Sequence, residues 1–195
     1  IQFSSPSKDY AEYLLKRDPK EELNPGDVVG VFGGQLSKET LGADHIMVIS
    51  SSPIIIGNFP GDKFVHLYGL TAFLGQVPVK VVGSVDKGDI LIVSGKQDGT
   101  AIAIKEHELL PEQLGLIVGR AWESSQDDSE TYVNTLIGFP FNVDIINSKI
   151  SDIKTMINSE FNQTNELEES LQDQLKRQDQ LIERLKKALS MVENN

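Results

Sequence analysis

The chain has 195 residues, a net charge of −11 and no cysteine. This length allows one hydrophobic core and an additional extended element without disulfides or metals. The acidic balance argues against nucleic acid and anionic membrane surfaces as partners, and the absence of thiols excludes cysteine nucleophiles, zinc–thiolate sites and disulfides. No apolar run approaches the roughly 20 residues of a membrane-spanning helix, so we expect no membrane insertion.

The first residues predict a linker that leads into an extended segment. Residues 1–7 are small and polar, and the chain begins at Ile1 rather than methionine, so we expect it to continue from an upstream segment. Aromatic and apolar residues are then interspersed with charges in residues 8–15, which favours a short strand or extended segment. The charged run that follows ends at Asn24-Pro25-Gly26-Asp27, a strong turn signal.

Residues 28–137 have the pattern of a compact all-β body. Short apolar runs of strand length alternate with turns rich in glycine, which is typical of a short-stranded barrel or sandwich. Gly33-Gly34 joins one pair of runs as a tight hairpin, Asp98-Gly99 joins another, and one short helix is expected at residues 106–114. The expected strands cover residues 28–32, 35–37, 45–50, 53–56, 65–74, 75–83, 90–93, 101–104, 116–123 and 131–137.

One short motif occurs twice in this β-rich part. Residues 25–29 read Pro-Gly-Asp-Val-Val, and residues 87–91 read Lys-Gly-Asp-Ile-Leu. In each copy the aspartate can accept hydrogen bonds from nearby backbone N–H groups, while the glycine can supply a positive φ. We interpret the two copies as equivalent hairpin turns of one barrel, a role that requires no ligand.

The pattern changes to helical spacing after residue 138. We expect a helix to begin near Asn142 or Asp144, either of which can cap its first turn. The frame does not run evenly into the residues that follow, so we expect a stutter or a break between Ile157 and Leu167, where asparagine and threonine lower helix propensity. The isoleucines that define the first part of the helix are Ile146, Ile150, Ile153 and Ile157.

Residues 161–192 carry the clearest signal in the sequence, the seam of a coiled coil. Leu167, Leu181 and Ala188 widen the apolar stripe at the neighbouring g position, which favours three or more helices, and Gln178 is a polar seam residue that can set the register. The alternative is one amphipathic helix packed on its own domain, but at about 48 Å the segment is too long to lie flat on a domain of this size. The seam residues are Phe161, Leu171, Leu175, Gln178, Ile182, Leu185, Leu189 and Val192.

Signatures of catalysis are weak. His45, His66 and His107 have neither metal-ligand nor nucleophile spacing, and no glycine-rich phosphate loop precedes a helix. Carboxylates in residues 124–130 could hold a cation, but an acidic surface loop is the commoner explanation. Trp122 is interpreted as a core or interface anchor. We therefore expect no metal and no cofactor.

Five short motifs in the β-rich part resemble motifs of a known family and are similarly placed. They are Asp9-Tyr10-Ala11-Glu12-Tyr13, Pro25-Gly26-Asp27-Val28-Val29-Gly30, Ser50-Ser51-Ser52-Pro53, Gly75-Gln76-Val77-Pro78-Val79-Lys80-Val81 and Val118-Gly119-Arg120-Ala121. Together they resemble the intramolecular-chaperone, auto-processing domains that end phage neck appendages and tail spikes. The resemblance covers about residues 7–138 and is followed, as in the family, by helical sequence.

The resemblance implies a trimeric, β-rich domain with a helical end, which helps a long fibrous protein to find its trimer register. Some members of the family cut themselves free through a serine at an Asp-Ser bond just before the Asp-Tyr-Ala-Glu segment. Here residues 3–8 read Phe-Ser-Ser-Pro-Ser-Lys, without an Asp-Ser bond, so we expect a relative that does not cleave itself. If cleavage occurs, Ser4, Ser5 or Ser7 is the candidate nucleophile, and Asp9 or Glu12 the candidate general base.

The sequence thus predicts a mainly β body followed by a C-terminal α-helical coiled-coil stalk. We expect a linker at residues 1–7, a β-rich assembly domain at 8–141, and a helical region at 142–195 with an oligomeric coiled coil at 161–192. The expected function is C-terminal trimerisation and assembly of a phage-like or bacterial surface fibre, with the chain itself and the upstream fibre segment as partners. We expect it on the virion or a cell-surface appendage, after assembly in the cytoplasm. The alternatives are a self-cleaving serine-dependent peptidase and a receptor-binding tip.

Overall fold

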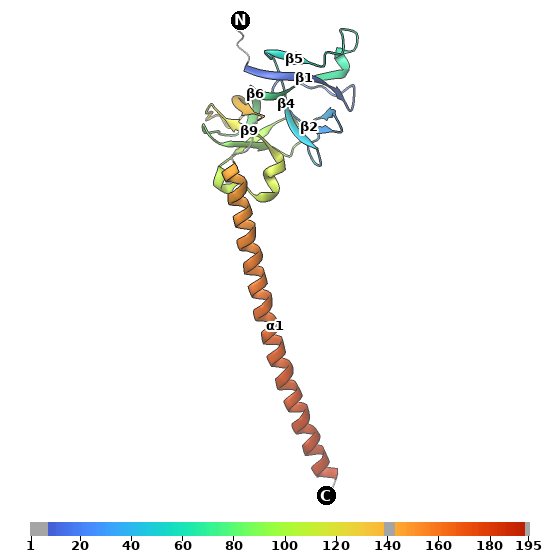
Figure 1. The fold of residues 1–195 in the computed structure, drawn as a ribbon, viewed down its shortest axis with the longest axis vertical. Coiled ribbons are helices and arrows are strands. Elements are labelled where there is room, and N and C mark those ends of the chain that lie inside the picture. Colours follow the sequence, from blue (N-terminus) through green and yellow to red (C-terminus); the bar gives the residue numbers. More distant parts are fainter. Residues whose placement is uncertain (1–7, 139–142, 194–195) are drawn as a thin grey trace. The chain divides into compact units, whose positions relative to one another are not determined.

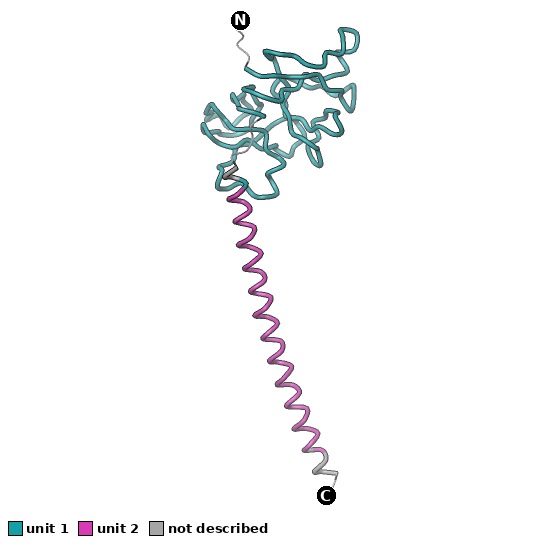
Figure 2. The backbone as a smooth tube through the Cα atoms, in the orientation of Figure 1, with its two compact units in different colours: residues 1–146 teal, residues 147–195 magenta. Residues whose placement is uncertain are grey.

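The computed structural model describes residues 8–138 and 143–193, with side chains described for residues 8–138, 146–187 and 189. The chain divides into two compact units, residues 1–146 and residues 147–195 (Figure 2). Strands make up the first unit, and a single long helix makes up the second (Figure 1). The predicted β body followed by a C-terminal helix is therefore confirmed. The predicted linker at residues 1–7 lies outside the described residues.

Ten strands in the described part of the first unit form one continuous sheet. The predicted strand at residues 8–15 and the two predicted glycine hairpins are all present. The strands are β1 (Lys8–Lys16), β2 (Val28–Phe32), β3 (Gln35–Ser37), β4 (His45–Ile49), β5 (Ile55–Gly57), β6 (Tyr68–Val82), β7 (Ile90–Val93), β8 (Ala101–Ile104), β9 (Ile117–Ala121) and β10 (Glu130–Ile137).

The strand pairings close two rings that share β6. In the first ring β6 pairs with β4, β4 with β2, β2 with β3, β3 with β1, and β1 with the N-terminal half of β6. In the second ring the C-terminal half of β6 pairs with β10, β10 with β9, β9 with β7, β7 with β8, and β8 with β6. Strand β5 pairs with β1 and lies outside both rings. The body thus consists of two small barrels joined through one long strand.

The two rings have the same connectivity. Strands β2, β3, β4 and the first half of β6 correspond to β7, β8, β9 and β10, while β1 corresponds to the second half of β6. The parallel pairing of β1 with β3 has its counterpart in the parallel pairing of β6 with β8. The Gly-Asp motif begins both copies: the N–H of Ile49 donates to the carbonyl of Asp27, and that of Ala121 to the carbonyl of Asp89, both at 2.9 Å. The motif therefore marks equivalent turns, as predicted, but in two rings rather than in one barrel. The turns are not hairpins as expected, because the described strands on either side of each turn, β1 and β2 or β6 and β7, do not pair with each other.

The largest hydrophobic cluster lies along β6 and joins both rings. Val77, Val79 and Val81 alternate along β6 and are fully buried, as the two-residue period of a strand requires. Burial of each such side chain contributes about 1.5–3 kcal/mol to folding. A smaller cluster fills the first ring around Val29 and Leu36, and another lies beside β7 and β9.

Residues 65–83 differ from the expectation of two successive strands. Val65–Leu67 forms a 3₁₀ turn, and β6 then continues without interruption from Tyr68 to Val82. Gly75 sits in the middle of β6 with a φ of 117°, where a Cβ would clash with the backbone of Lys8 on β1. The glycine that looked like a boundary in the sequence is therefore the point where β6 passes from one ring to the other.

The helix predicted at residues 106–114 is wrong. The structure has two 3₁₀ helices instead, η2 (Glu106–Glu108) and η3 (Pro111–Leu116). Pro111 disfavours helical geometry at the residue before it, and Leu110 is accordingly extended, with φ −85° and ψ 151°.

Helix α1 (Val143–Glu193) is continuous over 51 residues, or about 75 Å (Figure 1). The predicted break between Ile157 and Leu167 is therefore wrong, while a stutter in the heptad frame stays a prediction. The hydroxyl of Thr164 donates to the carbonyl of Glu160 at 2.9 Å, so this polar side chain is accommodated within the helix. Asn142, one of the predicted caps, lies outside the described residues. Within the described ranges, no helix has the length and apolarity that a membrane span requires.

Candidate functional site

The predicted seam lies along α1, and its described side chains are exposed. Their exposed fractions range from 48% at Ile182 to 66% at Leu189. Gln178 is also exposed, and the side chain of Val192 lies outside the described residues. The heptad frame places these positions on one face of the helix. The exposed seam side chains are Phe161, Leu171, Leu175, Ile182, Leu185 and Leu189.

The apolar stripe is wider and longer than the seam alone. At position g, Leu167 and Leu181 are 61% and 56% exposed. Toward the start of the helix Ile150, Ile153 and Ile157 are exposed as well. A helix in water derives most of its stability from packing of its apolar face, and each buried leucine or isoleucine contributes about 1.5–3 kcal/mol. The stripe is thus a surface whose burial would supply a large stabilisation.

The two catalytic candidates that the structure describes, Asp9 and Glu12, occupy separate places in the first unit. Ser4, Ser5 and Ser7 lie outside the described residues, whereas Asp9 and Glu12 lie on β1. Asp9 borders a hollow of about 370 Å³ lined mainly by polar residues, and Glu12 lines a different, mainly apolar cleft. The structure therefore does not bring Asp9 and Glu12 together into one site.

Asp9 is held in the interior by Ser50, the residue that follows β4. The Ser50 hydroxyl donates a hydrogen bond of 2.7 Å to the Asp9 carboxylate, and both residues are buried. Burial raises the pKa of Asp9 above its usual value, while the hydrogen bond from Ser50 acts in the opposite direction. Sequence reasoning did not propose Ser50 as the partner of Asp9, although it stands in one of the five family-like motifs. This pair links β1 to the end of β4.

The repeated Gly-Asp turn forms an ion pair in each ring. Asp27 has no exposed side-chain surface and lies 3.0 Å from the ammonium of Lys38, which follows β3. Its counterpart Asp89 lies 2.8 Å from the ammonium of Lys105, which follows β8. The aspartates accept backbone hydrogen bonds, from the N–H of Asn24 at 2.8 Å and of Asp86 at 3.0 Å. These groups support the fold, as the sequence reading of the motif expected.

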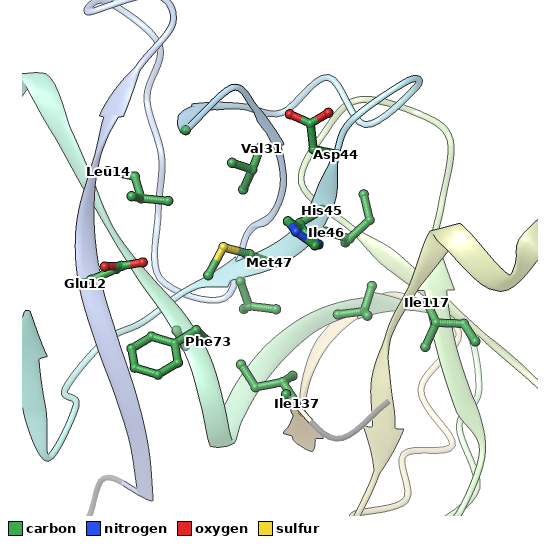
Figure 3. Close-up of a pocket in the computed structure, with 15 residues that line it drawn as sticks. Glu12, Leu14, Val31, Asp44, His45, Ile46, Met47, Phe73, Ile117 and Ile137 are labelled. Carbon is green, nitrogen blue, oxygen red and sulfur yellow. The ribbon is translucent and has the colours of Figure 1, made fainter. Parts of the chain in front are cut away.

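A cleft of about 630 Å³ opens between strands of both rings. Its walls are mainly apolar, and Figure 3 shows Met47 between Leu14 on one side and Ile117 on the other. Asp44 accepts a hydrogen bond of 2.6 Å from the N–H of Gly33. Among the described residues that line the cleft there is no serine, threonine or lysine. The polar side chains in it are Glu12, Asp44 and His45.

The remaining sequence candidates do not converge on a catalytic centre. In the described part of the chain, no group of three or more His, Asp or Glu side chains is arranged to hold a metal ion. Trp122 is 41% exposed, so its interpretation as a core residue is wrong, whereas an interface role stays a prediction. Trp122 directly follows β9 at the start of the loop that leads to β10.

Two solved structures are similar to the chain, whereas no protein-family model and no curated protein matches it. The C-terminal fragment of bacteriophage phi29 gene product 12 matches 66% of the chain and 99% of that fragment, at 14% identity and a TM-score of 0.47. The pre-mature bacteriophage phi29 gene product 12 matches 70% of the chain, at 13% identity and a TM-score of 0.48. The matched region makes up 23% of that longer protein.

Proposed function

We propose that the chain is a trimerisation and assembly module at the C-terminal end of a phage-like or bacterial surface fibre. The observation that carries the proposal is the exposed apolar stripe of α1. A single helix leaves this stripe in water, whereas a coiled coil of identical helices buries it along its whole length. The most economical partner is a second and third copy of the same chain, because each copy supplies the same stripe.

The width of the stripe favours three copies over two. Apolar residues at a and d cover the contact of two helices, and those at g extend the stripe to a further neighbour. Gln178 then forms one polar layer in an otherwise apolar core, which fixes the register at some cost in stability. A fibre module must set the register of its helices, because an error of one heptad would displace the upstream segments of the copies relative to one another.

The mechanism we propose is energetic rather than catalytic. Association of the helices supplies stability that one chain lacks, and this stabilisation aligns the upstream segments of the fibre. The proposal assigns no self-cleavage, because residues 3–8 contain no Asp-Ser bond and Asp9 is engaged by Ser50 in the interior. Location on the virion or on a cell-surface appendage belongs to the same proposal.

Sedimentation equilibrium of the full chain tests the proposal. We expect a mass three times that of the 21.5 kDa chain. A variant with Leu171→Gln, Leu175→Gln, Ile182→Gln and Leu185→Gln, here called the four-glutamine variant, should be monomeric. A control with Glu166→Gln and Gln180→Glu, both at position f on the opposite face, keeps the net charge and should remain trimeric. A full chain that is monomeric at all concentrations would contradict the proposal.

Prolonged incubation of the chain with its upstream fibre segment separates this function from the peptidase alternative. We expect the intact mass to stay unchanged. Release of the β-rich unit by cleavage before residue 9 would instead favour a self-cleaving domain.

A further inference from the structure

We propose that the cleft between strands of the two rings, here called the inter-ring cleft, binds a small apolar molecule that carries one positive charge, such as an aryl-alkylammonium ion. Its volume of about 630 Å³ lies within the range of small-molecule sites in proteins, roughly 300–1,000 Å³. Such sites combine apolar walls with a few polar groups that fix the orientation of the ligand. The site lies within the β-rich unit and goes beyond the assembly function proposed above.

The walls of the inter-ring cleft are apolar and come from both rings. Leu14 on β1 and Met47 on β4 belong to the first ring, whereas Ile117 and Val118 on β9 belong to the second (Figure 3). Ile117 and Val118 are buried, so this wall is part of the folded core. Strand pairing in each ring holds these residues, and the hollow is therefore preformed. An apolar group that enters it removes apolar surface from water.

The carboxylates of the inter-ring cleft give it a negative charge. Glu12 lies on β1, Asp44 directly precedes β4, and His45 is the third polar side chain. Among the described lining residues there is neither lysine nor arginine. Even with a protonated imidazole, these three side chains together carry a net negative charge. The cleft therefore repels an anion, whereas a cation gains Coulomb energy from the carboxylates, and more so in an apolar cleft than in open water.

Glu12 is the carboxylate with unused hydrogen-bonding capacity. Asp44 already accepts a hydrogen bond of 2.6 Å from the N–H of Gly33 and so holds the hairpin turn. No hydrogen bond or ion pair joins the side chain of Glu12 to another described residue, although Glu12 is half-buried. A carboxylate in this position has lost part of its hydration without a protein donor in return. An ammonium group, with its three N–H donors, supplies what is missing.

A β-bulge places an aromatic side chain on the same side of the inter-ring cleft. The pairing of β1 with β6 shifts register between Tyr10 and Ala11, which leaves Phe73 on β6 as an additional residue. Bulges re-aim side chains and are common beside functional sites. Phe73 lines the cleft two residues after Thr71, the partner of Glu12 in the register (Figure 3). The exposed ring adds cation–π attraction to the charge of the carboxylate.

Titration of the full chain with three probes of matched shape tests the proposal. At neutral pH 4-phenylbutylamine is a cation, 4-phenylbutan-1-ol is uncharged, and 4-phenylbutyrate is an anion. The chain has three methionines: Met47 lines the cleft, while Met156 and Met191 lie on α1, so ¹³C-methyl labels report the cleft with two internal controls. We expect the amine to shift the signal of Met47 alone and to bind about tenfold more tightly than the alcohol. The butyrate should bind more weakly than either.

Two variants test the role of Glu12. Glu12→Gln keeps the shape of the side chain and removes its charge, so it should raise the dissociation constant of the amine about tenfold. Its affinity for the alcohol should stay unchanged, which also shows that the cleft is intact. Glu22→Gln, at an exposed position outside the cleft, makes the same chemical change and should alter neither affinity.

Three results would overturn the proposal. A Met47 signal that responds to none of the probes would remove the site, and a response confined to Met156 and Met191 would place the binding on α1 instead. Equal affinities for the amine and the alcohol, in the wild type, would remove the selection for a positive charge. None of these results bears on the oligomeric state, which sedimentation equilibrium measures separately.

Discussion

Lys80 donates a hydrogen bond of 2.6 Å to the carboxylate of Asp27, and the Asp27 side chain has no exposed surface. Lys80 lies on β6, the strand that both rings share, while Asp27 precedes β2. Burial lowers the pKa of Lys80, but the hydrogen bond and the negative charge of Asp27 raise it above its usual value overall. In the part of the second ring that the structure describes, Asp89 has no buried lysine as partner: it pairs with Lys105, which is half-exposed and also pairs with Asp86.

This asymmetry predicts unequal effects of the same substitution in the two turns. Asp27→Asn leaves the buried ammonium of Lys80 without its main counter-ion and should lower the free energy of unfolding by about 3–5 kcal/mol. Asp89→Asn leaves Lys105 with Asp86 and with solvent, so the loss should be about 1 kcal/mol or less. Urea unfolding followed by the fluorescence of Trp122 measures both. Equal losses would mean that the Lys80–Asp27 ion pair stabilises the fold no more than the Lys105–Asp89 ion pair does.

A second prediction concerns the Asp9–Ser50 pair. Because the pKa of Asp9 is raised in the folded protein above its ordinary value of 3.8, the folded state binds this proton more tightly than the unfolded chain. The corresponding stabilisation is present below pH 3.8 and is lost as the pH rises through the folded pKa. Ser50→Ala removes the hydrogen bond to the carboxylate and should cost about 1–3 kcal/mol at neutral pH.

The pH dependence distinguishes this account from a simple packing defect. The cost of Ser50→Ala should shrink when Asp9 becomes protonated, because the neutral acid depends less on a donated hydrogen bond. Asp9→Asn serves as control, because asparagine cannot ionise. The stability of this variant should not fall above pH 3.8, whereas that of the wild type should. Urea midpoints of the wild type, Ser50→Ala and Asp9→Asn, measured over a pH series, give these pH dependences of stability. A pH-independent cost of Ser50→Ala would contradict the assignment.

The local features of the fold could be predicted from the sequence. Gly33-Gly34 and Asp98-Gly99 specify hairpins through their own turn geometry, and the aspartates of the repeated motif bind neighbouring backbone as expected. The helix that carries the exposed apolar stripe of α1 follows from the spacing of its apolar residues. Each of these features depends on residues that are close together in the chain.

Long-range partners could not be predicted, because they depend on strand register. Ser50 and Asp9 are 41 residues apart in sequence, and Lys80 and Asp27 are 53 apart. The closure of two rings on β6 requires that one strand pass through Gly75, a residue that reads as a boundary in sequence. The exposure of β5 could not be predicted either, because residues 53–56 have the composition of a buried strand.

A third prediction concerns the polar layer of the stalk. Gln178→Leu replaces a polar seam residue with an apolar one and should raise the melting temperature of the helical signal, while allowing more than one register or oligomer number. Gln180→Leu, at position f, should leave both properties unchanged. Circular dichroism at 222 nm and sedimentation velocity report the two effects. A lower melting temperature for Gln178→Leu would mean that Gln178 does not lie in the seam.

The last prediction is that the β-rich unit folds without the assembled stalk. The unit has its own hydrophobic core, in which Val79 and Leu91 are fully buried, and its rings close through pairings among its own strands. The stripe of α1, in contrast, is exposed in a single chain, and each of its leucines or isoleucines gains about 1.5–3 kcal/mol when another helix covers it.

The four-glutamine variant should therefore lose the trimer and much of the helical circular dichroism, while the β signal and the tertiary environment of Trp122 persist. Glutamine is a good helix former, so the loss reflects the missing contact rather than a poor helix propensity. The control with Glu166→Gln and Gln180→Glu should retain the whole spectrum. A four-glutamine variant that is unfolded throughout at low temperature would mean that body and stalk form one cooperative unit. If it stayed fully trimeric, the contacts between copies would lie in the β-rich unit alone.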